Sequence, residues 1–163
     1  MSVKAPWTRS SLNWSVSSMT VLRRTPCIGV CSTTYGDLVC RGCKRFAHEV
    51  VQWNSFNATQ QQTVWERLFE LRAGALSHLA EIADTQRLLL QAQRLGISLE
   101  QRIELIAFEV LRRAAAGGPD LRELGISPRQ TALNPAELYT SIEQEIYRRS
   151  LARYEHSFHI PAQ

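Results

Sequence analysis

The chain has 163 residues, of which 44% are hydrophobic and 21% are charged, and its formal net charge is +4. This size suits one domain of average length or two small ones, and an aromatic content of 8% with four tryptophans argues against disorder throughout. No apolar stretch approaches the roughly 20 residues that a membrane-spanning helix needs, so the composition excludes membrane-spanning, collagenous and fully disordered proteins.

The basic excess lies in the N-terminal half. Residues 20–73 carry seven Lys or Arg against four Asp or Glu and hold all four cysteines, whereas residues 74–163 carry ten basic against eleven acidic residues. Four thiolates around a doubly charged metal centre would add a charge of about −2 and leave residues 20–73 with about +1. The charge pattern therefore gives only weak support for nucleic-acid binding.

Residues 1–18 are rich in Ser and Thr and show no periodicity. They contain no continuous apolar stretch of the kind that a secretory signal needs. We expect residues 1–19 to be a flexible segment, with Met19 as the true or an alternative start. Without an export signal, a reducing cytoplasmic location is expected, where disulfides are disfavoured.

Residues 27–43 are interrupted by glycines and predict an irregular loop. A short helix is predicted over residues 44–53, because Phe46, Val50 and Trp53 recur at helical spacing. After a break at residues 54–57, a second helix is predicted from about residue 60 to residue 95.

Thr59 followed by Gln62 fits a capping box at the start of this second helix. Gly74 is its expected weak point.

The second half contains a small repeat, Leu-Gly-Ile-Ser, at residues 95–98 and 124–127. Glycine favours the left-handed conformation just after a helix end. The following isoleucine is expected to pack back on that helix, and the serine is expected to cap the next one.

Ser98 with Gln101 predicts a helix that continues to about Ala116, where Gly117-Gly118-Pro119 ends it. Ser127-Pro128 and Asn134-Pro135 both place a capping residue before a proline at the first helical position. The second pair predicts a helix over residues 135–156, whose apolar stripe is formed by Leu138, Ile142 and Ile146 and joined by Leu151.

The sequence thus predicts a mostly α-helical protein. An irregular four-cysteine metal loop is followed by short helices and a C-terminal helical region. We expect three parts: the N-terminal segment 1–19, a four-cysteine module over 20–73, and a helical region of unknown role over 74–163.

The most informative pattern is the spacing of the cysteines, which are Cys27, Cys31, Cys40 and Cys43. Four cysteines in two close pairs, with none elsewhere in a chain expected to be cytoplasmic, favour a metal site over disulfides or thiol redox chemistry. Tetrahedral sulphur ligation suits zinc and iron–sulphur clusters alike. The gap between the pairs is short for a zinc ribbon, and the spacing matches neither common ferredoxin pattern, so the metal stays open.

Basic residues flank the cysteines and are candidates for contact with an anion or a partner: Arg23, Arg24, Arg41, Lys44 and Arg45. Nearby cations lower the pKa of thiols and offset the charge of a four-thiolate centre. His48 could replace one cysteine as a ligand, although an exposed helical histidine is the simpler interpretation. Trp53 and Trp65 are expected in the core.

Four stretches within residues 26–72 carry a family resemblance: Cys-Ile-Gly-Val-Cys, Cys-Arg-Gly-Cys-Lys-Arg, His-Glu-Val-Val-Gln-Trp-Asn and Val-Trp-Glu-Arg-Leu-Phe-Glu-Leu-Arg. This segment resembles a small bacterial family, domain of unknown function 1289 (DUF1289), whose members are described as predicted iron–sulphur proteins. The resemblance implies that the four cysteines are ligands of an iron–sulphur cluster, with one structural zinc ion as the alternative. The sequence departs from many members at residues 46–48, which concerns the start of a helix rather than the ligands.

Three functions are expected. The first is a non-catalytic metal-binding accessory protein whose helical region docks a protein partner. The second is a zinc-stabilised interaction or nucleic-acid-binding module, and the third is an electron-transfer or redox partner protein. Outside the cysteines nothing in the sequence indicates an enzyme, and no contact with a membrane is expected.

Overall fold

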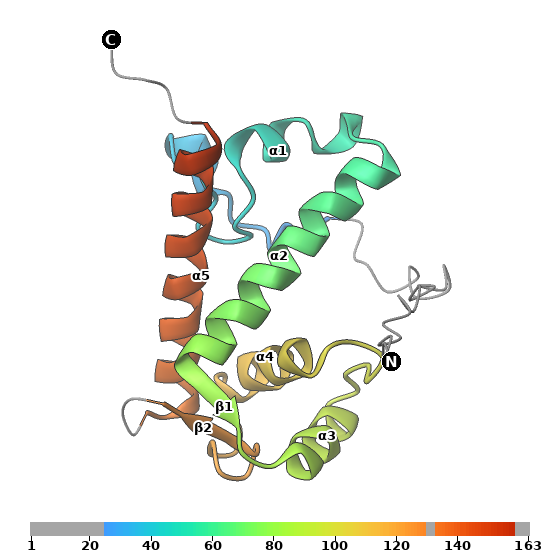
Figure 1. The fold of residues 1–163 in the computed structure, drawn as a ribbon, viewed down its shortest axis with the longest axis vertical. Coiled ribbons are helices and arrows are strands. Elements are labelled where there is room, and N and C mark those ends of the chain that lie inside the picture. Colours follow the sequence, from blue (N-terminus) through green and yellow to red (C-terminus); the bar gives the residue numbers. More distant parts are fainter. Residues whose placement is uncertain (1–24, 130–132, 159–163) are drawn as a thin grey trace, which may run out of the picture.

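The computed structural model describes residues 25–129 and 133–158 (Figure 1). The described chain is mostly α-helical, which confirms the expected fold class. Its helices and strands are α1 (Ala47–Val51), α2 (Ala58–Leu79), β1 (Ala80–Ile82), α3 (Thr85–Arg94), α4 (Ile103–Ala114), β2 (Ile126–Pro128) and α5 (Pro135–Ser157). The expected flexible segment 1–19 and the choice between Met1 and Met19 lie outside the described residues.

The two long helices, α2 and α5, form the frame of the molecule. They pack against each other, α4 packs against both, and α3 packs against α4. Figure 1 shows α3, α4 and the strands around the C-terminal end of α2, while α1 lies near the C-terminal end of α5. The cysteine segment contacts α5 at Glu143, Tyr147 and Ser150.

One cluster of buried apolar side chains fills the space between these helices. Its fully buried large members come from four helices and the loop before β2: Leu68, Leu76, Leu88, Ile106, Leu111, Leu124, Leu138, Ile142 and Ile146. Burial of each such side chain contributes about 1.5–3 kcal/mol. Trp53 and Trp65 belong to the same cluster, which confirms their expected place in the core.

The prediction of one helix from residue 60 to residue 95 is wrong. The chain leaves the helical conformation at Ala80, where β1 pairs with β2 in antiparallel register, Ala80 opposite Pro128 and Ile82 opposite Ile126. Ala80 and Ile126 are both buried, so this distant pairing and its packing on the core override the local helical pattern.

Gly74, the expected weak point, does not interrupt the helix and lies inside α2. A Cβ at this position would stand 3.0 Å from an Arg149 guanidinium nitrogen, so the glycine accommodates a side chain from α5.

The predicted cap of α2 is displaced by two residues. Asn57 Oδ1 accepts a hydrogen bond from the Gln60 backbone N–H at 2.9 Å, and Gln60 Oε1 accepts one from the Asn57 N–H at 2.9 Å. This reciprocal pair is the box that Thr59 and Gln62 were expected to form. The helix therefore begins at Ala58.

Two further helix starts differ from the prediction. Ser98 accepts from the Glu100 N–H at 3.3 Å within a local turn, and α4 begins only at Ile103 and ends at Ala114. Ser127-Pro128 lies in β2 rather than at a helix start, because the chain there pairs with β1. Asn134-Pro135 does open α5, with Asn134 Oδ1 accepting from the Glu137 N–H at 2.9 Å.

The first predicted helix, residues 44–53, is shortened to α1. Phe46 is extended and forms an isolated antiparallel bridge with Val39, so the helix cannot begin before Ala47. After α1 the chain makes a 3₁₀ turn at Trp53–Ser55.

Helix α2 runs without interruption across residues 73 and 74, the expected boundary between the cysteine module and the helical region. Its side chains contribute to the same core cluster on both sides of that point. None of the helices in residues 25–129 and 133–158 combines the length and apolarity that would let it cross a membrane.

Candidate metal centre

The second cysteine pair lies on a tight turn. The Cys40 N–H donates to the Arg45 carbonyl at 2.8 Å, and the Lys44 N–H donates back to the Cys40 carbonyl at 2.9 Å. Lys44 closes the turn in the left-handed conformation, with φ 62°. This turn buries both Cys40 and Cys43.

The Cys40 sulphur accepts several hydrogen bonds. Burial raises the pKa of its thiol, but backbone N–H groups of Cys43, Ser32 and Gly42 donate to its sulphur, and the pKa falls to about 7. The Cys43 side chain also donates to this sulphur. The lowered pKa favours the thiolate, the form that binds metal.

The Cys43 thiol lies in a more buried environment than the Cys40 thiol. Burial raises the pKa of its thiol above the ordinary value, although the Arg45 guanidinium opposes this shift. The Arg45 Nε–H donates to the Cys43 sulphur at 3.4 Å. The Cys43 sulphur thus lies beside a cationic hydrogen-bond donor.

The first pair is arranged differently. Cys27 is exposed, and its sulphur accepts from the Gly29 N–H at 3.4 Å. Cys31 is half-buried and lies 3.0 Å from the Thr33 hydroxyl. All four cysteines are free thiols, and within the described residues no three His, Cys, Asp or Glu side chains are grouped so as to hold a metal ion.

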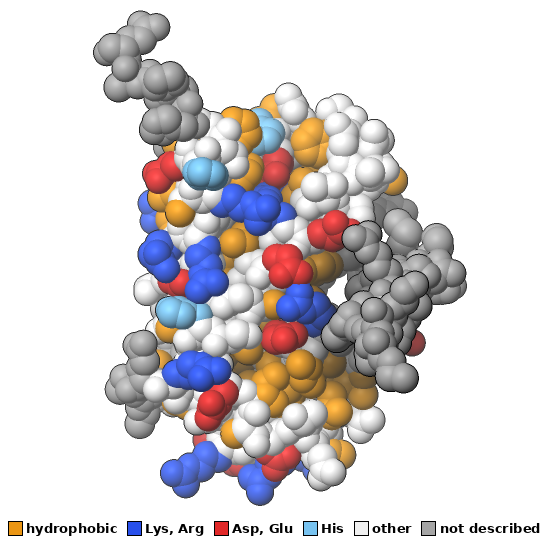
Figure 2. All heavy atoms as spheres, in the orientation of Figure 1, with side chains coloured by type: hydrophobic (Ala, Val, Ile, Leu, Met, Phe, Trp, Pro, Cys, Tyr) orange, Lys and Arg blue, Asp and Glu red, His pale blue; other side chains and the backbone are white. Residues whose placement is uncertain are grey.

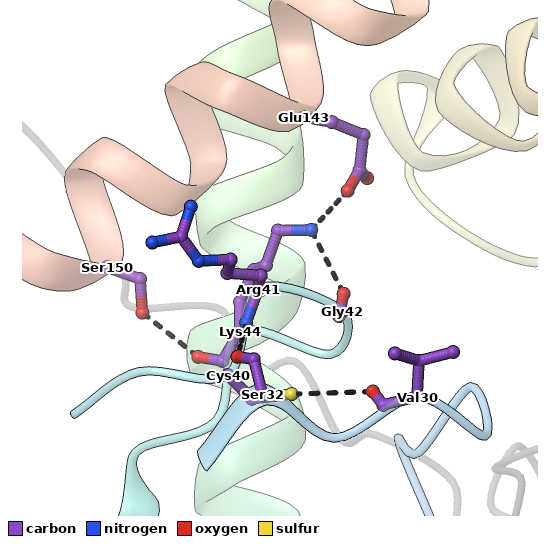
Figure 3. Close-up of polar contacts among 8 residues, drawn as sticks. All are labelled: Val30, Ser32, Cys40, Arg41, Gly42, Lys44, Glu143 and Ser150. Carbon is purple, nitrogen blue, oxygen red and sulfur yellow. Dashed lines mark hydrogen bonds and ion pairs between the residues drawn. The ribbon is translucent and has the colours of Figure 1, made fainter. Parts of the chain in front are cut away.

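The backbones of the two cysteine loops nevertheless lie in contact (Figure 3). The Arg41 N–H donates to the Ser32 hydroxyl at 2.8 Å, and the Cys40 thiol donates to the Val30 carbonyl at 3.8 Å. A Cβ at Gly42 would stand 2.9 Å from that same carbonyl and 3.0 Å from the Ile28 side chain. Only glycine at position 42 permits this approach.

These observations test whether the site fits the metal that the sequence implies. The donors are four soft sulphur atoms, which suit zinc or an iron–sulphur cluster. Cys40 and Cys43 are already adjacent and surrounded by N–H groups, as thiolate ligands require. Cys27 and Cys31 lie on the loop that packs against this pair. The donor chemistry of these four side chains therefore fits such a group, and the Cys40 and Cys43 side chains contact each other.

The structure separates the five basic candidates. Arg23 and Arg24 lie outside the described residues. Arg41 is exposed, pairs with Asp37 at 2.8 Å and lies over the Tyr147 ring. Lys44 and Arg45 are buried, so they are inaccessible to a large partner and act within the fold.

Lys44 ties the cysteine turn to α5 (Figure 3). Its ammonium group pairs with Glu143 and donates to the Gly42 carbonyl at 3.0 Å, while its own carbonyl accepts from the Ser150 hydroxyl at 3.0 Å. The position of Cys43 thus depends on a helix that lies a hundred residues further along the chain.

A second buried link was missed by the sequence analysis. Arg67 on α2 pairs with Glu49 on α1, and its guanidinium lies 3.9 Å from the centroid of the Phe46 ring. Glu49 also accepts from the Phe46 N–H at 2.8 Å.

One signal could have revealed part of this network. Ser150 continues the buried stripe of Ile142 and Ile146 at a spacing of four, where Leu151 was expected and is only half-buried. A polar residue in an apolar stripe indicates a buried hydrogen bond. Glu143, Glu49 and Arg67 carry no comparable signal.

His48 is exposed on α1, in agreement with the interpretation of this residue as an exposed helical histidine. Its ring lies against Phe46 and Phe158.

The fold and this site define a mostly α-helical protein with an N-terminal four-cysteine segment. Residues 25–72 match the family described as "Protein of unknown function (DUF1289)", which confirms the family assignment of this segment. Comparisons with curated proteins and with solved structures found no match.

Proposed function

We propose that this chain is a non-catalytic metal-binding accessory protein in which Cys27, Cys31, Cys40 and Cys43 hold an iron–sulphur cluster. One structural zinc ion is the alternative occupant. The observation that carries the proposal is the Cys40–Cys43 pair, buried, adjacent and supplied with backbone N–H donors, with the pKa of Cys40 at about 7.

The first cysteine loop supports the proposal through its contact with this pair. Cys27 and Cys31 are held only by short local contacts with Gly29 and Thr33. Turning their side chains toward Cys40 costs little compared with the affinity of four thiolates for a metal. Binding is therefore expected to draw the first pair to the second and to order the loop.

The proposal includes a reducing cytoplasm as the location, because free thiols persist there and four cysteines can bind metal rather than form disulfides. Its role there would be to present the metal centre to a protein partner. On the face shown in Figure 2, basic and acidic side chains are interspersed. This pattern gives the nucleic-acid alternative less support than a single basic surface would.

Purification without oxygen, followed by metal and sulphide analysis, tests the proposal. A cluster would give about two or four iron atoms per chain, equal inorganic sulphide and visible sulphur-to-iron bands. One zinc ion per chain in a colourless protein would support the alternative. If the protein purified without oxygen held well below one ion of either iron or zinc per chain, both forms of the proposal would be contradicted.

Serine variants of each cysteine assign the ligands. Each of the four is expected to lose most of the metal, because the chain contains no other cysteine that could substitute. His48→Ala is the matched control, since His48 is the alternative ligand that the sequence offers and its loss is expected to leave the metal content unchanged. If loss were confined to the Cys40 and Cys43 variants, the first pair would not be a ligand pair.

A further inference from the structure

Arg45 occupies an unusual position beside the cysteine pair. It is 3% exposed, and its Nε–H donates to the Cys43 sulphur at 3.4 Å. Its guanidinium lies 4.8 Å from the centroid of the Trp53 ring. The buried Nη1 atom has no hydrogen-bond partner.

Three other cations in or beside the cysteine segment are each balanced by a carboxylate. Arg41 pairs with Asp37, Lys44 with Glu143 and Arg67 with Glu49. Within the part of the chain that the structure describes, no carboxylate lies within ion-pair distance of Arg45. The side-chain hydrogen bond of its guanidinium goes instead to the sulphur of Cys43.

A buried cation without a counter-charge is costly. Desolvation of an isolated ion in a protein interior costs several kcal/mol unless an opposite charge compensates it. The face of a tryptophan ring offsets only part of this cost, and a neutral thiol adds little. Four thiolates on a doubly charged metal centre carry a net charge of about −2, which would supply the missing counter-charge.

We propose that Arg45 is the counter-ion of the four-cysteine centre and the hydrogen-bond donor that positions Cys43. This inference rests on the proposed function. Of the five basic residues that flank the cysteines, only Arg45 is assigned the role of counter-ion. Lys44 has a structural role. Trp53 holds the guanidinium from the other side and fixes its orientation.

The expected consequence concerns metal retention rather than the fold. Partners that orient metal ligands typically contribute about 10- to 100-fold in metal affinity. Arg45→Gln is therefore expected to release metal to a chelator about 10- to 100-fold faster than the wild-type protein. Arg45→Lys keeps the charge and is expected to recover most of this loss.

The test uses the full chain loaded with its native metal, or with Co²⁺ as a coloured probe if the native metal is zinc. Release to excess EDTA is followed by the visible sulphur-to-metal bands. Arg41→Gln is the control, because it removes one positive charge from the same loop at a residue without a sulphur contact. It is expected to behave like the wild type.

A second readout separates a counter-ion from a merely structural residue. Loss of the guanidinium charge beside Cys43 is expected to shift the sulphur-to-metal bands of Arg45→Gln. In an iron–sulphur protein it also makes the reduction potential more negative, because the reduced centre carries the larger negative charge. Arg41→Gln should show neither change.

The outcomes are distinct. If Arg45→Gln releases metal within twofold of the wild-type rate with unshifted bands, or if Arg41→Gln is equally impaired, the role of Arg45 is wrong while the metal centre stands. If the wild-type chain binds no metal, the proposed function itself has failed. Should Arg45→Gln not fold, Arg45→Lys decides: because it keeps the positive charge, it must release metal within about twofold of the wild-type rate if Arg45 is the counter-ion.

Discussion

At the scale of single residues, buried charges hold the cysteine segment on the helices. Arg67 and Glu49 lie on different helices, have side chains 9% and 8% accessible, and each also contacts Phe46. Lys44 is similarly enclosed by Gly42, Glu143 and Ser150. Such pairs are costly to break from one side, because the remaining charge stays buried.

Arg67→Met is expected to lower the free energy of unfolding by about 3–5 kcal/mol, since it leaves the Glu49 carboxylate buried without its cation. The double variant Arg67→Met with Glu49→Gln removes both charges and should recover part of this loss. Urea unfolding of the three proteins measures both differences. Equal stabilities of the single and double variants would contradict a buried ion pair.

The Glu145 carboxyl is expected to make the stability of the fold depend on pH. Hydrogen bonds from Arg148, and from Arg149 next to it, lower the pKa of its carboxyl to about 2, although burial acts in the opposite direction. A carboxyl whose pKa is lower in the folded state stabilises the fold above its unfolded value of about 4.3, and this contribution disappears as the pH falls toward 2.

Glu145→Gln is therefore expected to cost about 1 kcal/mol at pH 7, a modest value because water screens pairs at the surface of a helix. The difference from the wild type should shrink between pH 4.5 and pH 2. Thermal unfolding across this range checks it. A pH-independent difference would mean that the glutamate acts through packing.

At the scale of elements, caps decide where the helices begin. Asn57→Ala is expected to lower the free energy of unfolding by about 1 kcal/mol, because it removes the acceptor for the Gln60 N–H. Thr59→Ala is the matched control and should change stability by less than about 0.5 kcal/mol. If the two variants were equally destabilised, Asn57 would not be the effective cap.

The repeat Leu-Gly-Ile-Ser shows which structural roles a local sequence pattern can predict and which it cannot. Gly96 and Gly125 both adopt the left-handed conformation, with φ 64° and 71°, and Ile97 and Ile126 both pack in the core, as predicted. The serines differ. Ser98 closes a turn and Ser127 lies in a strand, because the role of each serine depends on which segment packs beside it in space.

At the scale of the whole molecule, α2 joins the cysteine segment to the helical core. We expect Cys40→Ser to lose metal and to accelerate amide hydrogen exchange in residues 25–56 by about 10-fold or more, because metal affinity is folding free energy for such a loop. Helices α2, α4 and α5 should keep their protection, since their apolar faces pack on one another. Hydrogen exchange with mass spectrometry locates the change.

Exchange that rises equally in α4 and α5 would contradict this expectation and show that the metal supports the whole core. His48→Ala serves again as the control and should leave the exchange pattern of residues 25–56 close to that of the wild type.

The sequence by itself determined the mostly helical fold, the cap at Asn134, the buried tryptophans and the family of residues 25–72. These arise from side-chain periodicity, local hydrogen-bonding chemistry and a short-range motif, all of which act within a few residues. Only the tertiary structure decided the break at Ala80, the links from Lys44 to α5 and from Arg67 to Glu49, and the isolation of Arg45 beside Cys43. Each of these features depends on residues that come into contact only when distant segments of the chain pack together. A local sequence pattern therefore cannot predict which buried cation pairs with a carboxylate and which donates a hydrogen bond to a sulphur.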